Sequence, residues 1–405
     1  MDGTSQVTGE PPPPLRARLL EVAAAFLRLG ATAFGGPAAH VGLLEEEFVR
    51  RRAWVTQQEF LDFLGATNLI PGPNSTEMCI HLGYRRAGLA GLVLAGVCFI
   101  LPAAVLSGAL AWAYLSYGTL PALGFLLYGI KPAILAVILG AVGRLGRTAI
   151  KDGFLAVLAV AAVGSSLAGV NELLVLFGGA GLGALRAAAR SFRSSGGPGS
   201  AAGPGSTAGL VALGLQGAAA AHAAGAGSAT LVSLGAFFLK VGSVLYGSGY
   251  VLIAFLRNGL VVDRRWLTES QLIDAVAIGQ FTPGPLLSTA TFIGYLVQGW
   301  TGALVATVGI FLPSFVFVLL THRSIHKLRS SDVLAGFLDA VNVAALGLMA
   351  TVTVELATDA LRGWPAWVIG ALAAAGALFT RLSPTWWIAG GALLGLLASW
   401  AGWTH

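Results

Sequence analysis

A proline-glycine-proline stretch occurs twice in the chain, and its residue types predict a broken helix at each place. The copies are Pro71-Gly72-Pro73 and Pro283-Gly284-Pro285, and each lies between two apolar segments. Proline removes a backbone donor and clashes with the preceding turn, while glycine allows left-handed geometry. Each copy should therefore end one helix and expose the first N–H groups of the next. Those groups carry partial positive charge and can bind an anion.

Hydroxyl and amide side chains follow each break and could add donors to an anion site. Asn74, Ser75 and Thr76 follow the first break, and Ser288 and Thr289 follow the second. Residues of these types also cap helix starts. The structural alternative is a pair of proline kinks without a ligand, but the equivalent positions of the breaks in a repeat favour a ligand.

Glu77 follows the first break, where the second half of the chain carries Thr289 instead. A carboxyl group at this place could carry a proton in a proton-coupled cycle. A carboxylate in the first turn of a helix is also stabilising without any such role.

Three cations lie within otherwise apolar segments. Arg28 and Lys240 are matched across the repeat, and Lys131 falls opposite Asn342. A charge inside an apolar helix is costly and usually functional, whereas snorkelling to the membrane interface is the alternative. We expect Arg28 and Lys240 to bind the anion, with Lys131 and Asn342 lining its path.

A second glycine break follows each matched cation. In the first half it is Phe34-Gly35-Gly36-Pro37, and Gly35 and Gly36 would let a ligand approach the backbone. In the second half it is Tyr246-Gly247-Ser248-Gly249.

Four further polar residues are expected to hold structure. Asp62 and Asp274 match across the repeat, and we expect them to fix helix geometry against Arg52 and Arg264.

Histidine and cysteine give no sign of a metal or redox site. His322 and His326 are four residues apart but lie in a basic loop, so we expect no metal there. Cys79 and Cys98 have apolar neighbours and read as small buried hydrophobes. No cofactor is expected.

The composition is that of a polytopic α-helical membrane protein. Of the 405 residues, 56% are hydrophobic and only 10% are charged, against about 25% charged in soluble domains. Apolar runs of roughly 20 residues recur, as spanning helices require, and the short alternating segments of a β-barrel are missing. Most Arg and Lys lie in short loops, so the net charge of +6 does not indicate nucleic acid. The expected surroundings are a lipid bilayer.

The chain is two copies of one unit. Trp54 and Trp266 are 212 residues apart, as are Pro71 and Pro283. Beyond the breaks the shift is 211 residues, as between Pro102 and Pro313. We assign residues 1–14 to an N-terminal tail, 15–190 to the first repeat, 191–208 to a Gly/Ser/Pro linker and 209–405 to the second repeat. Residues 209–228 form either an extra span or more linker.

Loop charges predict that the two halves are inverted. Arg85 and Arg86 precede an apolar run whose far end is uncharged, so they are expected in the cytosol. In the second half the matching loop, 297–300, is uncharged, and the far end at 321–329 is strongly basic. Arg264 and Arg265 run against this pattern, because inversion places them outside. The expected fold is an all-α polytopic membrane protein, an inverted-topology repeat with broken or re-entrant helices, as in many secondary transporters.

Several of these motifs together resemble the chromate ion transporter family. They are Phe34-Gly35-Gly36-Pro37, the Trp54 region, Pro71-Gly72-Pro73 before Gly83-Tyr84-Arg85-Arg86-Ala87-Gly88, and Phe99-Ile100-Leu101-Pro102. The resemblance covers about residues 20 to 360. It implies a bacterial inner-membrane protein of the long, two-domain type that exports chromate and confers resistance, with sulfate as a competing analogue. The second half lacks the Gly-Gly-Pro at Tyr246 to Gly249.

Other functions stay open at this point. The same fold could move sulfate or another oxyanion, or catalyse uptake. A membrane enzyme would need a nucleophile and base or a metal cluster at depth, and none is found; a channel would favour a continuous polar pore. The chain is also compatible with a homo-oligomer.

Overall fold

The structure is a computed structural model that describes residues 13–34, 37–117, 121–194, 229–246, 249–322, 331–361, 363–380 and 384–401. Within these ranges every regular element is helical. The first half consists of α1 (Leu15–Thr32), α2 (Pro37–Glu45), η1 (Glu46–Arg51), α3 (Gln57–Thr67), α4 (Asn74–Tyr117), α5 (Pro121–Ala149), α6 (Gly153–Leu167) and α7 (Glu172–Ser194). The second half consists of α9 (Leu231–Val244), η2 (Gly249–Val251), α10 (Leu252–Leu256), η3 (Arg257–Asp263), α11 (Glu269–Phe281), η4 (Leu286–Ser288), α12 (Thr289–Thr321), α14 (Asp332–Ala360), α15 (Trp364–Phe379) and α16 (Pro384–Trp400).

The backbone repeats along with the sequence. Thr56 begins α3 with a capping box to Glu59, and Thr268 begins α11 with the same box to Gln271. In such a box the side chain and the backbone of the two residues satisfy each other's free groups. The preceding π-helices η1 and η3 are likewise equivalent. The two halves therefore share local conformation as well as residue types.

The helices α4 and α12 each contain a sharp turn near their start. Gly88 and Gly299 have φ +61° and non-helical ψ, and the residues before them also leave helical geometry. A positive φ of this kind favours glycine. The segment before the turn folds back on the segment after it, because a Cβ added at Gly83 would collide with the carbonyl oxygen of Gly91. Gly294 and Gly302 make the matching contact.

Small residues allow this fold. Lipid offers no hydrophobic drive for helix association, so close backbone approach through glycine supplies van der Waals packing instead. Each half thus contains a re-entrant pair: α3 or α11 leads to the proline-glycine-proline loop, and a short helical segment returns from it to the hairpin turn.

The long arms of α4 and α12 pack on each other and run antiparallel. Gly96 packs on Phe315, and Gly108 packs on Trp300, so the partner number falls as the α4 number rises. At one end Tyr84 lies beside His322, with ring centroids 4.2 Å apart. The end of α12 therefore lies beside the first hairpin, and the two halves have inverted topology.

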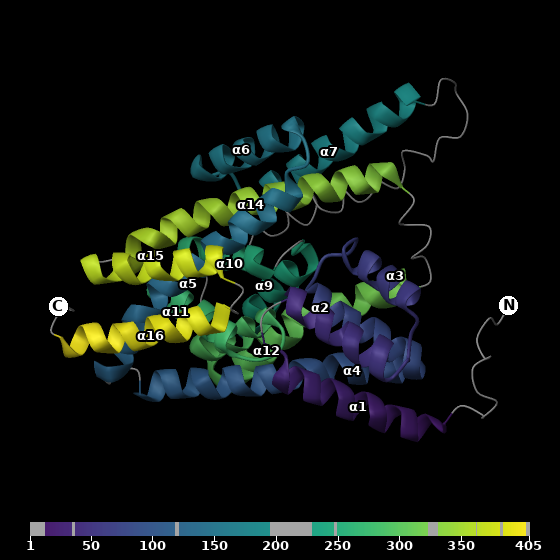
Figure 1. Ribbon diagram of the computed structural model, residues 1–405, viewed down its shortest axis with the longest axis horizontal. Coiled ribbons are helices and arrows are strands. Elements are labelled where there is room, and N and C mark those ends of the chain that lie inside the picture. Colours follow the sequence, from purple (N-terminus) through teal and green to yellow (C-terminus); the bar gives the residue numbers. More distant parts are fainter. Residues whose placement is uncertain are drawn as a thin grey trace.

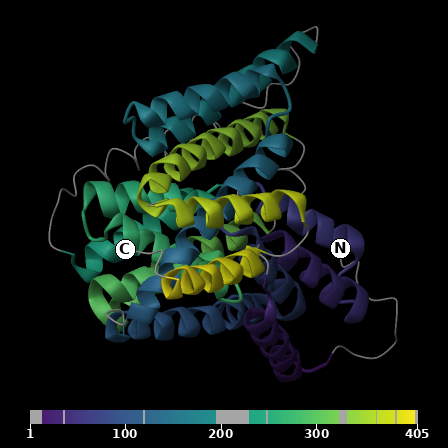
Figure 2. The same ribbon diagram turned by 60° about the vertical axis from the view of Figure 1, so that its left-hand side comes forward.

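The last helices of each half pack on the other half. α15 and α16 contact α5 of the first half, and α6 and α7 contact α14 of the second half. Figures 1 and 2 both show α6 and α7 running along α14. The halves are therefore intertwined, and the largest core cluster draws residues from both.

Five helices in the described part of the chain are long and apolar enough to cross a membrane. They are Asn74–Tyr117, Gly124–Ala149, Glu172–Ser191, Leu286–Thr321 and Asp332–Thr358. The outer faces of α4 and α12 carry matching stripes of exposed apolar side chains with a spacing of four residues. These are Leu89, Val93, Val97, Leu101 and Val105 on α4, and Trp300, Leu304, Val308, Leu312 and Val316 on α12. Such one-sided stripes are the surface that lipid covers.

Several expectations lie outside the described residues. They concern Gly35 and Gly36, Gly247 and Ser248, His326, and most of the tail and linker at 1–12 and 195–208, with the segment 209–228. The helix break around Gly35 is nevertheless bounded, because α1 ends at Thr32 and α2 begins at Pro37. Cys79 is buried and Cys98 half-buried, and both thiols are free.

Candidate functional site

The two proline-glycine-proline loops are buried, and each is bonded to the other half of the chain. The Gly72 N–H donates to the carbonyl of Leu245, just after α9, at 2.8 Å. The Gly284 N–H donates to the carbonyl of Ala33, just after α1, at 2.8 Å. Both glycines have positive φ. Non-helical backbone at membrane depth is tolerated where protein encloses it, and these crossed bonds provide that enclosure.

Neutral hydroxyl groups surround the second loop. Ser107 of α4 donates to the Oγ of Ser288 at 3.3 Å, and Thr282 lies 3.4 Å from the same Ser288 oxygen. Thr289 donates to the carbonyl of Leu286 at 2.8 Å. All of these side chains except Leu286 are buried. The second loop therefore offers hydroxyls that can turn toward an incoming acceptor.

The first loop carries a carboxyl group in place of these hydroxyls. Glu77 is fully buried, and neither of its carboxyl oxygens has a hydrogen-bond partner in the described part of the chain. Its Oε1 lies against Gly72, and Ser314 of α12 faces the same glycine. Thr76 is buried beside it, and its hydroxyl is also without a partner there.

The flanking residues Asn74 and Ser75 complete the start of α4. Asn74 donates to the side-chain oxygen of Asn68 at 2.6 Å, and Ser75 is buried. The site is thus asymmetric: one helix start has an acidic side chain against it, whereas the other has only hydroxyls.

A buried ion pair lies near the C-terminal end of α4. Asp274 of α11 lies 3.4 Å from the Lys131 ammonium and accepts a hydrogen bond from the Tyr114 hydroxyl at 3.0 Å. Lys131 also donates to Ser270 at 2.6 Å. We expected Asp274 to pair with Arg264, and this is wrong because α5 brings Lys131 to it instead.

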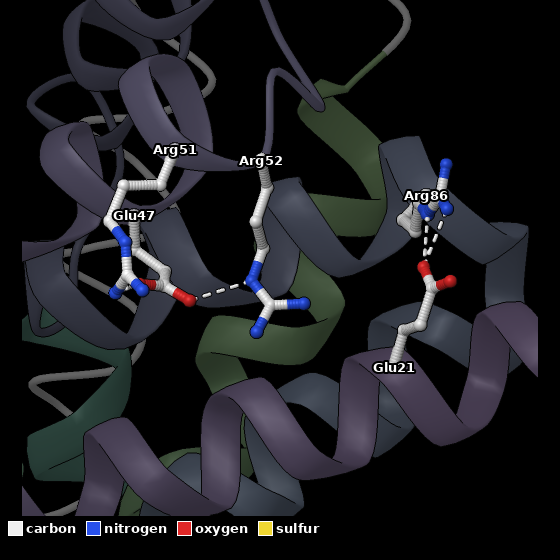
Figure 3. Close-up of polar contacts among 5 residues, drawn as sticks. All are labelled: Glu21, Glu47, Arg51, Arg52 and Arg86. Atoms are coloured by element: carbon white, nitrogen blue, oxygen red, sulfur yellow. Dashed lines mark hydrogen bonds and ion pairs between the residues drawn. The ribbon is translucent and has the colours of Figure 1, made fainter.

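The matching expectation for Asp62 is also wrong. Gln58 donates to Asp62 at 3.2 Å, whereas Arg52 pairs with Glu47 at 2.6 Å. The π-helix η1 turns Glu47 toward the two arginines that follow it, and Arg51 binds the other carboxyl oxygen at 2.7 Å (Figure 3).

The same end of the first half holds a second ion pair. Arg86, at the hairpin turn, binds Glu21 of α1 (Figure 3). The guanidinium groups of Arg52 and Arg86 lie over the Trp54 ring, 5.6 and 5.2 Å from its centroid. Cation–π contacts of this kind stabilise exposed sites modestly.

The second half replaces this charge cluster with neutral groups. Gly259 stands where the first half has Glu47, and Arg264 donates to its carbonyl at 3.1 Å. Arg264 also lies over the rings of Phe237 and Trp266. This explains why Arg264 departs from the loop-charge pattern: its cation is held by a carbonyl and two aromatic faces.

The matched cations lie on the first helix of each half. Arg28 is exposed on α1, and Lys240 is half-buried on α9. Asn342 is half-buried on α14, and its counterpart Lys131 forms the ion pair with Asp274. Around each loop the structure places residues that follow it in the chain, with Ser107 of α4 at the second loop and Ser314 of α12 at the first.

Sequence reasoning missed one pair of residues that the structure joins. His81 of α4 is buried, and its Nδ1 lies 3.1 Å from the Nδ1 of His322, at the end of α12. Phe63 stacks on the His81 ring at 5.2 Å between centroids. The available signal was the spacing of Glu77 and His81, which places both on one face of a helix.

Comparison with known proteins identifies the family of this chain. A sequence model of the family described as chromate transporter matches residues 20–184 and 232–396, which are the two repeats. The chain belongs to the chromate transporter family. It is accordingly a multi-pass bacterial membrane transporter.

Several relatives in the chromate transporter family match this chain along nearly their whole length. The chain is 32% identical to a chromate transport protein of Cupriavidus metallidurans, over 92% of this chain and 91% of the relative. It is 33% identical to one of Pseudomonas aeruginosa, over 93% and 90%. A probable chromate transport protein of Synechococcus elongatus is 31% identical over 86% and 87%. No solved structure matches the chain.

Proposed function

We propose that this protein is a secondary active exporter of chromate that binds the dianion at the two proline-glycine-proline loops. The observation that carries the proposal is the pair of crossed hydrogen bonds, Gly72 to Leu245 and Gly284 to Ala33. They bury two helix starts within one bundle, and helix starts attract anions through free N–H groups and the helix dipole. Helix breaks of this kind form the substrate sites of inverted-repeat transporters.

The side chains near the loops support a tetrahedral oxyanion. Ser288, Ser107 and Thr282 share one hydroxyl network at the second loop, and Thr76 offers a further hydroxyl at the first. Hydroxyls can donate to any of the four oxygens of chromate. Sulfate has the same shape and charge, so it is the second candidate, and the hydroxyls do not distinguish the two ions.

Transport of chromate in membrane vesicles tests the proposal. Everted vesicles that contain the protein should accumulate radiolabelled chromate under an imposed pH gradient, and sulfate should compete. Replacing Pro71-Gly72-Pro73 by three alanines should abolish accumulation while the protein stays in the membrane. Full activity in this variant would remove the first loop from the site.

The direction of transport is tested by the same preparation. An exporter loads everted vesicles, whose cytosolic face is outside, and cells that produce it survive higher chromate concentrations. Faster loading of right-side-out vesicles would instead show uptake and overturn the export proposal.

A further inference from the structure

Glu77 stands out because its carboxyl group is buried without a cationic partner among the described residues. It is fully buried, and neither carboxyl oxygen has a hydrogen-bond partner among the described residues. In the same part of the chain no lysine or arginine forms an ion pair with it. Burial of an unpaired charge is expensive, and a bound proton removes that cost. The matching residue of the second half, Thr289, hydrogen-bonds to the carbonyl of Leu286 and carries no charge.

A buried histidine lies one helical turn further along the same face. His81 is four residues after Glu77, and a helical side chain covers the turn that precedes it. One ring nitrogen, Nδ1, faces His322, and the other, Nε2, is buried without a partner in the described structure. Phe63 stacks on one side of the ring. Glu77 and His81 do not hydrogen-bond each other, so a proton would pass between them through a water.

The next group leads to the surface. His322 ends α12, is only half-buried, and packs on Tyr84 at 4.2 Å between ring centroids. Arg85, the next residue after Tyr84, pairs with Glu59 at 3.2 Å at the same end. This is the end whose loop charges place it in the cytosol. The titratable side chains of His322, His81 and Glu77 thus lie one after another between that surface and the first loop.

We infer that Glu77 is a proton-binding site of the transporter, and that His322 and His81 conduct the proton between it and the cytosolic surface. The inference deepens the proposed transport function and rests on it. A proton that arrives on His322 leaves from its Nδ1 to the Nδ1 of His81, and His81 releases another from Nε2 to an intervening water, which passes one of its own protons to the carboxyl oxygen of Glu77. Each ring gains one proton and loses one, so only Glu77 changes its net charge.

Proton and anion occupancy are coupled by charge. An ionised Glu77 against Gly72 repels a dianion at the same loop, whereas a protonated Glu77 does not. By linkage, a bound dianion favours the proton on Glu77 by the same factor.

The other side chains near Glu77, His81 and His322 supply no positive charge that could neutralise Glu77 in place of a proton. Tyr246 follows α9 and acts on Glu77 electrostatically, Ser314 comes from α12, and Tyr84 lies on α4 itself. None of these three side chains is cationic at neutral pH.

The test uses purified full-length protein in proteoliposomes that contain a pH-sensitive dye. Two reactions are measured: exchange of radiolabelled chromate for chromate at equal pH, and dye response when chromate flows down its gradient. The wild type should show both. Chromate flux without a dye response would overturn the inference and leave the transport function intact, whereas no flux of any oxyanion would overturn the transport function itself.

Variants assign the proton to these residues. Glu77→Gln should lower the dye response at least about tenfold while chromate exchange stays within about twofold. His81→Gln and His322→Gln should each slow the proton-coupled flux about tenfold and spare exchange. Asp339→Asn, which alters a partly exposed carboxylate paired with Lys151, should change neither reaction.

Retained chromate exchange also shows that a variant is folded. A variant that loses exchange and elutes as aggregate is replaced by Glu77→Asp, which keeps the carboxyl group and should keep the dye response. The proposal would be refuted by an unchanged dye response in Glu77→Gln. It would also be refuted if both histidine variants carried protons at the wild-type rate.

Discussion

At the scale of single residues, the buried ion pair of Asp274 and Lys131 should contribute strongly to stability. Asp274 has only 2% of its side chain exposed, and it depends on Lys131 for a countercharge and on Tyr114 for a hydrogen bond. Removing one member of a buried pair leaves the other uncompensated, and this costs more than removing both.

Lys131→Ala should therefore destabilise the protein strongly. We expect about 3 kcal/mol, the low end of the range for breaking a buried pair, because the lysine keeps some exposure. The double variant Lys131→Met with Asp274→Leu should recover most of this loss. Thermal unfolding in detergent measures both, and a double variant no better than the single one would contradict the buried-pair argument.

Glu47 gives a prediction with a pH dependence. Burial raises the pKa of its carboxyl group, but the hydrogen bond and charge of Arg52, with the charge of Arg51, outweigh burial and hold it below the ordinary value of 4.5. A lowered pKa stabilises the fold above the ordinary value, and this contribution is lost as the pH falls toward the folded-state pKa.

Glu47→Gln should accordingly lower the free energy of unfolding at pH 7, by at most about 1 kcal/mol because both arginines keep solvent access, and Tm should fall with it. The difference in Tm between wild type and variant should shrink between about pH 5 and pH 3. A difference that is constant across this range would mean that the charge of Glu47 is not what stabilises the cluster.

At the scale of elements, the helical hairpins place the loops. Each hairpin returns a short segment from its loop to the membrane surface, and contact between two glycines holds its arms together. A side chain at this contact would separate the arms and move the loop at their base.

Gly91→Leu and Gly302→Leu should each abolish transport and lower Tm. A Cβ at either position would collide with the carbonyl oxygen of the opposing glycine, which is backbone and cannot move aside. Gly143→Leu is the matched control, because nothing lies within 4 Å of the Cβ position there. Chromate flux and thermal unfolding are the measurements; equal behaviour of Gly91→Leu and the control would reject the hairpin packing.

At the scale of the whole molecule, contacts between the two halves make them interdependent. Each loop is bonded to the residue just after the first helix of the other half. The last helices of each half pack on α5 or α14 of the other half, as Figures 1 and 2 show for α6 and α7 along α14. Relative movement of the halves would therefore open and close the proposed anion site at the loops.

A cross-link between the halves should stop this movement. Ser107 and Ser288 have oxygens 3.3 Å apart, so cysteines at both positions, in a background without Cys79 and Cys98, should form a disulfide. Oxidation should block chromate flux, and reduction should restore it. Full flux in the cross-linked protein would show that this contact stays fixed during transport.

The inverted topology has its own test. Cysteines placed singly at positions 85 and 298 should react with an impermeant reagent from opposite sides of the membrane. Reaction from the same side would refute the inversion.

Much of the architecture follows from local sequence. Proline and glycine in the loops dictate backbone geometry wherever they occur, and the repeat places Gly88 and Gly299 at equivalent turns. Loop charges indicate orientation because short loops rich in Lys and Arg stay on the cytosolic side during membrane insertion. The helix breaks, the repeat and its inversion were therefore predictable without coordinates.

Contacts between distant residues were not predictable in this way. The bond from Gly72 to Leu245, the pairing of Lys131 with Asp274 and the approach of His81 to His322 each join residues more than 130 positions apart. Which side chains meet depends on how the helices cross and which glycines let them approach. The sequence by itself determined where the helices break and how the halves are oriented; only the tertiary structure decided which groups those breaks bring together, because that choice is made by packing between helices.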